Sequence, residues 1–489
     1  MRTRSPLTRF ATLACALAAA ALAGCGGDAT DPTTNDLGDK EESFDGEAPN
    51  IVVVMTDDQA ADTMVAMPKT RRLLGGEGTT FTRGTISFPL CCPSRATFLT
   101  GQYAHNHGVK DNGPPDGGIG ALDQERTLPV WLRGAGYETA FVGKYLNGYG
   151  KDKNGGPEFV PPGWVRWYAL TSDDKTSAYD YAVNENGELV HYGNGKGNYK
   201  TDVMARLSRK AVRETAPGPR PFFLWVATSA PHTDNGLPPN ARRNPLPAPR
   251  HLGKYKRAQP PQGGSFDESD VSDKPRWIRK LPRLNPRKRR AIRKLYVSQL
   301  ESLGAVDDLV AGLVRQLRRE GELDRTLFVF TSDNGFIRGR HRIRSGKSLI
   351  YEEAINVPLL MAGPGIPKGE VYRRPVANVD LAPTLLRAAG VEPGLEQDGV
   401  PLQPVIAGER ERPPVLLEIY GRKDGNVFGI RTGDYVYAEH ADGFVELYDL
   451  RRDPFQLENA ANDPALATQR LRLKAELGRL RSCSGASCS

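Results

Sequence analysis

The sequence has 489 residues, of which 39% are hydrophobic, and this is enough for one large α/β domain with a smaller addition. Such a composition excludes a mainly disordered chain. The formal net charge of +8 falls to +5 without Arg2, Arg4 and Arg9, which lie in a segment that we expect to be removed. This excess favours an anionic partner only weakly. Because the sequence contains no nucleic-acid-binding motif, we expect no nucleic-acid partner.

The first 48 residues predict an export signal and a tether. Residues 1–24 combine a basic start with an Ala/Leu-rich run that is too short for a membrane-spanning helix. The run ends in Leu22-Ala23-Gly24-Cys25, which resembles a bacterial lipobox and implies a lipidated Cys25; the alternative is an ordinary signal peptide with Cys25 incidental. Residues 25–48 are polar, which predicts a flexible tether. We therefore expect an exported lipoprotein that faces outward from the cell membrane and is held by its lipid anchor alone.

The first element of the folded region is the apolar run Asn50 to Met55, whose β-branched residues are typical of a strand buried on both faces of a parallel sheet. It is followed by Asp57 and Asp58. Ligands of open α/β sheets collect at the carboxyl ends of strands, and two acids in a loop there can turn toward one cation. The alternative is a capping aspartate beside a solvated one.

The run Cys91 to Gly101 predicts a helix, because Pro93 suits a first helical turn and the apolar residues after it can face inward. Cys91 would then lie at the helix N-terminus, where unpaired N–H groups favour negative charge. With Arg95 one turn away, Cys91 is a candidate anion-handling nucleophile. On the residues alone, a disulfide between Cys91 and Cys92, or two inert buried thiols, explains the pair equally well.

Three more apolar runs predict buried strands, and each is followed by side chains that can bind ligands. The runs are 138–142, 222–227 and 326–330. The side chains that follow them are Lys144, His232, Asp333 and Asn334. A surface lysine and a structural histidine are the ordinary alternatives for the first two.

Oxygen donors that follow two of these strands predict a divalent-metal site. The donors are Asp57, Asp58, Asp333 and Asn334. Carboxylate and amide oxygens suit Ca²⁺ or Mg²⁺ better than zinc, for which the sequence offers no His or Cys cluster with ligand spacing. Three basic side chains are available to hold an oxyanion beside the cation, namely Arg95, Lys144 and Lys347.

The remaining segments complete the prediction. Residues 161–203 are rich in Trp, Tyr and Gly, and we expect loops there whose aromatic residues pack at the sheet edge; the alternative is that they stack on sugars. Residues 240–290 predict an insertion without strands, either a lid or an irregular surface loop, that runs into a basic cluster, 287–294. We expect the charges of this cluster to lie in solvent; attraction of an anionic polymer is the alternative. Apolar residues at helical spacing predict a long helix over 292–320. From residue 411 onward, short alternating runs and a helix near 465–480 predict a small antiparallel sheet with one helix.

Two shorter patterns concern the second half of the chain. Residues 347–353 predict the start of a helix. Cys483 and Cys488 are separated only by small residues and suit a disulfide loop in an oxidising compartment.

Cys91 begins the pattern C-x-P-x-R followed by A-T-x-x-T-G, which resembles the signature of the type I, formylglycine-dependent sulfatases. In that family a maturation enzyme oxidises the first cysteine to formylglycine, which implies Cys91 as the modified residue and a formylglycine-generating enzyme as a partner. The resemblance extends from Asn50 to about Ala460 and implies an alkaline-phosphatase-like fold, with a mixed, mostly parallel sheet between helices. The resemblance, together with the change to short alternating runs from residue 411, predicts a catalytic domain at 49–410 and a C-terminal α+β subdomain at 411–489.

The resemblance also implies roles for the site residues. One calcium ion would be bound by Asp57, Asp58, Asp333, Asn334 and the formylglycine made from Cys91. The sulfate would be contacted by the basic residues Arg95, Lys144, His232 and Lys347. In the implied reaction, a hydroxyl of the hydrated formylglycine attacks the sulfur atom and His232 protonates the departing alcohol.

The chain departs from the family pattern in two places. Many sulfatases have G-K-W-H where this chain has Gly143-Lys144-Tyr145-Leu146, and Ile337 stands where several members carry a histidine. The base that expels the sulfate is therefore open, with Asn147, His105 and His107 as candidates. The run Gly143-Lys144-Tyr145-Leu146, together with the Cys-Cys pair, resembles the N-acetylglucosamine-6-sulfatase and extracellular heparan 6-O-endosulfatase branch of the family.

We therefore expect a sulfuric ester hydrolase that acts on a sulfated carbohydrate such as glucosamine 6-sulfate, or on aryl sulfates. One alternative is a phosphodiester or phosphonate monoester hydrolase of the same superfamily, which turnover of phosphate against sulfate esters would identify. The other is a non-catalytic lipoprotein that binds sulfated glycans without releasing sulfate.

Overall fold

The structure is a computed structural model that describes residues 48–171, 177–216, 218–234 and 244–489. The predicted signal peptide, Cys25 and nearly all of the predicted tether lie outside these residues, so the lipid anchor stays a prediction. Within the part of the chain that is described, no helix has the length and apolar character needed to cross a membrane.

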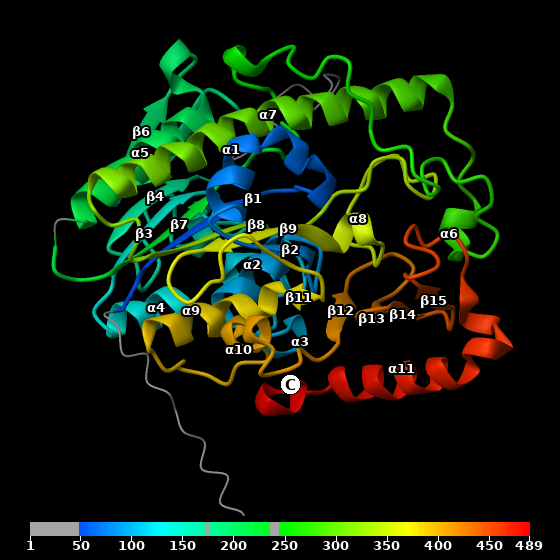
Figure 1. Cartoon of the computed structure of the whole chain (residues 1–489). Helices are drawn as coiled ribbons and strands as arrows, with labels where there is room; N and C mark the ends of the chain where they lie inside the picture. The colour runs from blue at the N-terminus through cyan, green and yellow to red at the C-terminus, as the bar shows by residue number, and fades with distance from the viewer. Residues whose placement is uncertain (1–47, 172–176, 217, 235–243) are drawn as a thin grey trace, which may run out of the picture. The chain divides into compact units, whose positions relative to one another are not determined.

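A sheet of eleven strands forms the centre of the described structure (Figure 1). The strands, in spatial order, are β10 (Glu370–Tyr372), β2 (Gly78–Thr85), β9 (Asn356–Ala362), β8 (Thr326–Ser332), β1 (Asn50–Thr56), β7 (Phe222–Ala227), β3 (Glu138–Gly143), β4 (Arg166–Leu170), β5 (Tyr181–Glu185) and β6 (Glu188–Tyr192), with β11 (Val376–Ala377) paired to β2. The five central strands from β8 to β4 run parallel, whereas β9, β5 and β6 run antiparallel to their neighbours. The predicted mixed, mostly parallel sheet is confirmed.

The register of the central strands brings their carboxyl ends level. Every residue of β1, β7 and β8 is buried, as expected for apolar strands covered on both faces. Met55 of β1 lies opposite Ala227 of β7 and Thr331 of β8. Because the three strands are parallel, the loops that follow them begin at the same edge of the sheet.

Helices cover both faces of this sheet (Figure 1). One face packs against α5 (Lys200–Thr215), α7 (Pro286–Arg319) and the short α1 (Pro68–Thr70). The other packs against α2 (Cys91–Thr100), α4 (Leu128–Gly134) and α9 (Leu381–Ala389), with α3 (Ala104–His107) and α10 (Leu402–Ala407) beside them.

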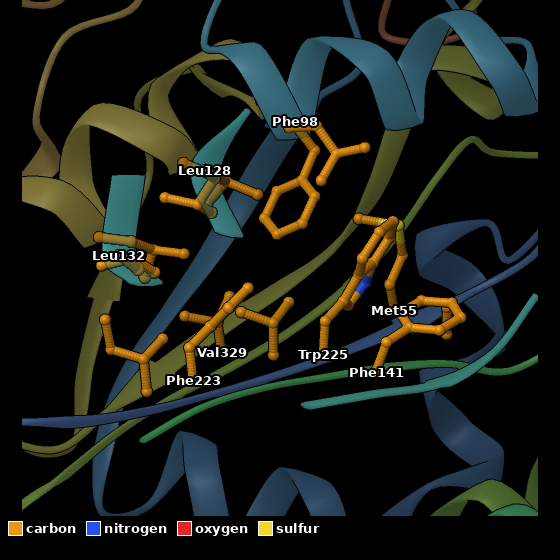
Figure 2. Close-up of a cluster of buried hydrophobic side chains, with 14 of the residues drawn as sticks. Met55, Phe98, Leu128, Leu132, Phe141, Phe223, Trp225 and Val329 are labelled. Carbon is orange, nitrogen blue, oxygen red and sulfur yellow. The ribbon is translucent and has the colours of Figure 1, made fainter. Parts of the chain in front are cut away.

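The core between α2 and the sheet is dominated by aromatic and aliphatic side chains (Figure 2). Phe98 of α2 points toward the sheet, where its ring centroid lies 5.0 Å from that of Trp225 on β7. The Trp225 ring lies equally close to Phe141 of β3. All three side chains are fully buried, and burial of each stabilises the fold by about 1.5–3 kcal/mol. This packing fixes α2, and with it Cys91, relative to the strand ends.

A second sheet follows near the C-terminus. Its antiparallel strands are β12 (Val415–Ile419), β13 (Val427–Arg431), β14 (Tyr435–His440) and β15 (Val445–Asp449), and α11 (Ala467–Leu480) packs against it. A disulfide joins Cys483 to Cys488 just after α11. Both sheets belong to one compact unit, so the division of the chain at residue 410 stays a prediction.

Hydrogen bonds tie the C-terminal sheet to the segments around α2 and α3. The N–H of Glu418 in β12 donates to the carbonyl of Ser87 (2.9 Å), and the Glu418 carboxylate accepts from the N–H of Ala104 (2.8 Å). Arg422, in the loop after β12, donates to the carbonyl of Ser348 (3.2 Å). The C-terminal sheet therefore supports two segments that lie close to the predicted site residues.

The prediction of loops over 161–203 is wrong. This segment contains β4, β5 and β6 and leads into α5. The strands were missed because each is only five residues long and lies among turn-forming residues, so neither a long apolar run nor a sustained alternation marks it. The helical spacing of Val203, Leu207 and Ala211 in α5 was a usable signal.

Helix boundaries also differ from the prediction. The long helix α7 begins at Pro286 because the side chain of Asn285 caps it and accepts from the N–H of Lys288 (2.9 Å). The basic cluster 287–294 is therefore part of the helix and does not belong to the insertion. The helix expected over 347–353 is reduced to α8 (Glu352–Ile355), because the chain passes directly into β9. In the described residues 244–285 only the short α6 (Arg276–Arg279) and one 3₁₀ turn occur, as expected for an insertion without strands.

Candidate active site

Four side chains from three segments meet at the carboxyl edge of the central sheet. One ligand atom each of Asp57, Asp58, Cys91 and Asp333 lies within 4.8 Å of the others, and all four residues are buried. Asn334 joins them, because its amide nitrogen donates to Asp58 Oδ1 at 2.7 Å. The structure thus gathers the five residues that were predicted to hold a metal ion.

The backbone after β1 sets the direction of the two adjacent aspartates. Asp58 has a φ of 65°, a left-handed conformation that is uncommon for residues other than glycine. Its N–H donates to Asp333 Oδ1 at 3.1 Å, and the N–H of Asp333 donates to the carbonyl of Thr56 at 3.0 Å. The positive φ lets the side chains of Asp57 and Asp58 turn toward the same point, which a continued strand would forbid.

The guanidinium of Arg95 contacts the buried carboxylates. Its Nε and Nη2 lie 2.9 and 2.8 Å from Asp333 Oδ2, and Nη2 lies 3.8 Å from Asp57 Oδ2. A further guanidinium nitrogen donates to the carbonyl of Lys144. The Arg95 side chain is fully buried, so it compensates the carboxylates without contacting solvent.

Two lysines and a histidine surround the same cluster. The ammonium of Lys144 forms an ion pair with Asp57, and that of Lys347 pairs with Asp58 and lies 2.8 Å from Cys91 Sγ. His232 Nε2 lies 3.7 Å from Asp58 Oδ2. All the basic residues predicted to contact an oxyanion are therefore at the cluster.

The site opens on the side of His232 and Lys347. Their side chains are 17% and 16% exposed, whereas those of Asp57, Arg95 and Lys144 are 2% exposed or less. An approaching substrate therefore meets His232 and Lys347 first, with the carboxylates behind them.

Burial and charge shift the titration of the cluster. Burial alone would raise the pKa of Asp57, but the positive charges of Lys144, His232, Arg95 and Lys347 outweigh it and lower the pKa. Burial, reinforced by the charge of Asp57, raises the pKa of Cys91 to about 12 although the two lysines oppose it. An unmodified Cys91 is therefore a protonated thiol at neutral pH and a weak nucleophile.

Cys91 and Cys92 are not joined in a disulfide. Cys91 is the first residue of α2 and faces the carboxylates, whereas Cys92 packs in the core between α2 and the sheet. The side-chain oxygen of Asn112 accepts from the N–H of Cys92 at 2.9 Å. Asn112 was missed from the sequence, because a single asparagine in a Gly/Pro-rich loop carries no periodic or motif signal.

The two histidines proposed as bases make contacts elsewhere. The ring nitrogens of His105 lie 3.0 Å from Glu418 Oε1 and 2.8 Å from the carbonyl of Cys483. His107 Nε2 lies 3.1 Å from Thr97 Oγ1, and burial lowers the pKa of His107 to about 3. The contacts of both rings are therefore structural.

The donor set fits a hard divalent cation such as Ca²⁺. Three carboxylates and an amide converge in a buried site, and Ca²⁺ prefers oxygen ligands of this kind. Carboxylates buried this close together need positive charge nearby, and in this structure Lys347 Nζ supplies part of it by contacting Asp58 and lying 3.5 Å from Asn334 Oδ1.

Acidic and basic side chains meet at the carboxyl ends of a mostly parallel sheet with helices on both of its faces, and this architecture is that of the alkaline-phosphatase-like class. Family models narrow this class. The model described as "Sulfatase" matches residues 49–391, and the one described as "N-sulphoglucosamine sulphohydrolase, C-terminal" matches residues 339–483. The chain belongs to the sulfatase family and is a sulfate ester hydrolase.

Full-length relatives agree with this assignment. The chain is 34% identical to human (Homo sapiens) N-acetylglucosamine-6-sulfatase over 492 residues, which cover 90% of this chain and 86% of the relative. It is 32% identical to an arylsulfatase of Volvox carteri, with 90% and 76% of the two chains covered.

Solved structures share the fold. A protein determined in complex with its substrate D-glucosamine-2-N,6-O-disulfate superposes with a TM-score of 0.75 at 25% identity, covering 89% of this chain and 98% of the other. The phosphonate monoester hydrolase of Agrobacterium radiobacter, at 24% identity and a TM-score of 0.63, shares the fold over 89% of this chain and 95% of its own.

Proposed function

We propose that this sulfatase removes sulfate from glucosamine-containing carbohydrate, through a formylglycine made from Cys91 and a calcium ion held by Asp57, Asp58, Asp333 and Asn334. The observation that carries this proposal is the convergence of those oxygen donors on the first residue of α2. The substrate class is supported by a relative named N-acetylglucosamine-6-sulfatase and by the glucosamine disulfate bound in a related structure.

When present, formylglycine supplies the attacking oxygen and calcium polarises it together with the sulfate oxygens. The basic side chains of this chain complement the negative charge that grows on the sulfate. Lys347 is partly exposed and can bind a sulfate oxygen directly, whereas Lys144 is buried against Asp57. Arg95 acts behind them by fixing the orientation of Asp333.

His232 is suited to protonate the departing alcohol. Its Nδ1 lies 2.8 Å from the carbonyl of Thr233, which can only accept a hydrogen bond, so Nδ1 carries a proton. Nε2 is then the nitrogen that gains and loses a proton, and it lies on the open side of the site. Asn147 has an amide side chain, which does not take up a proton at neutral pH, so we do not assign it as the base for the step that expels the sulfate.

Mass analysis of the peptide that contains Cys91 tests the central claim. We expect an aldehyde in protein made with a maturation enzyme, and sulfate release that is lost in Cys91→Ala. Fully active protein with an unmodified thiol would contradict the proposal. Turnover of matched sulfate and phosphate monoesters should favour the sulfate ester, and a preference for phosphate would overturn the substrate assignment.

We also propose that the enzyme is exported and anchored through Cys25 at the outward-facing side of the cell membrane. The support is the Leu22-Ala23-Gly24-Cys25 motif and relatives named as extracellular sulfatases. We expect detergent to release the wild-type protein from membranes and Cys25→Ala to be soluble after export. Wild-type protein that is secreted freely would contradict the anchor.

A further inference from the structure

A polar pocket adjoins the N-terminal turn of α2, because Asn112 in its lining accepts the N–H of Cys92. It has a volume of about 270 Å³ and is formed by two loops, 112–120 and 147–154. Five polar side chains line it, namely Asn112, Asn147, Lys151, Lys153 and Asn154, and the rest of its wall is glycine and proline. No carboxylate is among the lining residues. This volume is slightly below the roughly 300–1,000 Å³ of typical small-molecule sites, so the pocket suits one small polar group.

The pocket is attached to two of the segments that carry proposed catalytic groups. Asn112, in its first loop, accepts the N–H of Cys92, the neighbour of Cys91. The second loop begins at Asn147, three residues after Lys144, and its first carbonyl accepts from the N–H of Ile119 at 2.8 Å. The lining of the pocket is therefore one hydrogen bond away from the residue that follows Cys91, and three residues along the chain from Lys144.

The two lysines of the pocket suit an anion, and its buried amide oxygen suits a hydrogen-bond donor. Lys151 and Lys153 are exposed, and neither forms an ion pair in the described part of the chain. The side-chain oxygen of Asn147 is buried and has no hydrogen-bond partner among the described residues. The neighbouring acids Asp111, Asp116 and Asp152 are exposed and lie outside the lining, and none of them forms an ion pair with either lysine among the described residues.

We propose that this pocket binds the sugar next to the one that carries the scissile sulfate, and that Lys151 and Lys153 recognise a second oxyanion on that sugar. The proposal rests on the proposed function and adds that the preferred substrate is an oligosaccharide with at least two negative groups. The oxyanion is a carboxylate or a second sulfate, both of which lysine ammonium groups bind as point charges. Asn147 provides an acceptor for a sugar hydroxyl.

The test compares four substrates with the matured, calcium-loaded enzyme. Two are disaccharides with 6-O-sulfated glucosamine joined to a second sugar that bears either a carboxylate or a sulfate. A third has a neutral second sugar, and 4-nitrophenyl sulfate lacks the second sugar altogether. The variants are the double change Lys151→Gln with Lys153→Gln, and Gly113→Leu, whose side chain would enter the pocket without meeting another atom near its Cβ. Lys474→Gln and Gly478→Leu on α11 are matched controls, since both residues are exposed and Gly478 is equally unobstructed.

We expect the double lysine variant to raise KM for the anionic disaccharides by about fivefold to tenfold, as for the loss of two exposed ion pairs. The effect should fade at an ionic strength of about 1 M, where charges are screened beyond about 3 Å. Gly113→Leu should weaken all three disaccharides. Turnover of 4-nitrophenyl sulfate should change less than about twofold in every variant, as should all turnover by the controls. The anionic disaccharide whose KM rises more in the lysine variant identifies carboxylate or sulfate as the preferred group.

Equal losses on 4-nitrophenyl sulfate and the anionic disaccharides, or no loss on either, would overturn the pocket proposal. If wild-type enzyme hydrolyses no sulfate ester, the proposed function fails separately. Calorimetric binding of the anionic disaccharides to Cys91→Ala protein then decides on the pocket, because weaker binding in the lysine variant supports it and unchanged binding refutes it.

Discussion

Replacing Arg95 by methionine measures how far the buried carboxylates depend on its guanidinium. The side chain is fully buried, with two nitrogens within 2.9 Å of Asp333 Oδ2 and one 3.8 Å from Asp57 Oδ2. Methionine keeps much of the volume but removes the charge, so Asp333 would remain as a buried carboxylate without its nearest cation. Loss of one partner from a buried ion pair costs about 3–5 kcal/mol, and we expect the free energy of unfolding of Arg95→Met to fall by that amount.

Urea unfolding followed by tryptophan fluorescence is a suitable assay. The protein should be stripped of divalent cations, because a bound cation would also compensate Asp333. Arg133→Met is a matched control: its guanidinium is 43% exposed and lies 3.6 Å from Glu138, a pair whose loss costs about 0–1 kcal/mol. If Arg95→Met loses no more stability than Arg133→Met, the dependence of the acidic cluster on Arg95 is refuted.

Three further perturbations have defined outcomes. Gly143 has a φ of 120°, and a Cβ added there would lie 2.0 Å from the carbonyl oxygen of Ala227. Gly143→Ala should therefore lower the free energy of unfolding by at least about 1–3 kcal/mol in chemical denaturation. Gly134→Ala is the control, because its Cβ would meet no other atom. Burial lowers the pKa of His105, but the hydrogen bond and the charge of Glu418 outweigh burial and raise this pKa overall. The His105–Glu418 pair should therefore stabilise the fold fully below a pH of about 6.5 and lose this contribution as the pH rises through the raised pKa. Thermal melts of His105→Gln across this range should lose that pH dependence, and an unchanged profile would contradict it. Chelation of divalent ions should lower Tm, with recovery in Ca²⁺ and none in Zn²⁺.

The buried strands were predictable because their sequences satisfy a strong physical requirement. The apolar runs of β1, β7 and β8 can be accommodated only where both faces are covered, and the polar residues that follow them therefore fall at one edge of the sheet. From these patterns alone, Asp57, Asp58, Asp333 and Asn334 could be grouped before any geometry was known.

Other features were not predictable from local pattern. The left-handed conformation of Asp58 depends on its N–H reaching Asp333, which lies far away in the sequence. The edge strand β6 is short and largely exposed, with only Val190 and Tyr192 half-buried on one face. Asn285 followed by Pro286 is a local helix-start signal, but no large apolar residue follows it before Ile292, and this hid the first turns of α7. From the residues alone, Lys347 was only one of three cations available to hold an oxyanion, and the family resemblance gave it a contact with sulfate, since a lysine in a basic loop has no distinguishing signal of its own.

The hydrogen bonds of Glu418 and Arg422 limit how this enzyme can be cut or recombined. A fragment that ends at residue 410 would leave the N–H of Ala104 and the carbonyl of Ser348 without their present partners, and it would uncover the apolar residues that face β12. Ser348 directly follows Lys347, which is partly exposed at the site. Exchanging the C-terminal sheet for that of a relative would therefore also change the hydrogen bond that supports the segment of Lys347. Chimeras built to alter substrate preference should therefore carry the loop 338–348 and the C-terminal sheet together from one parent.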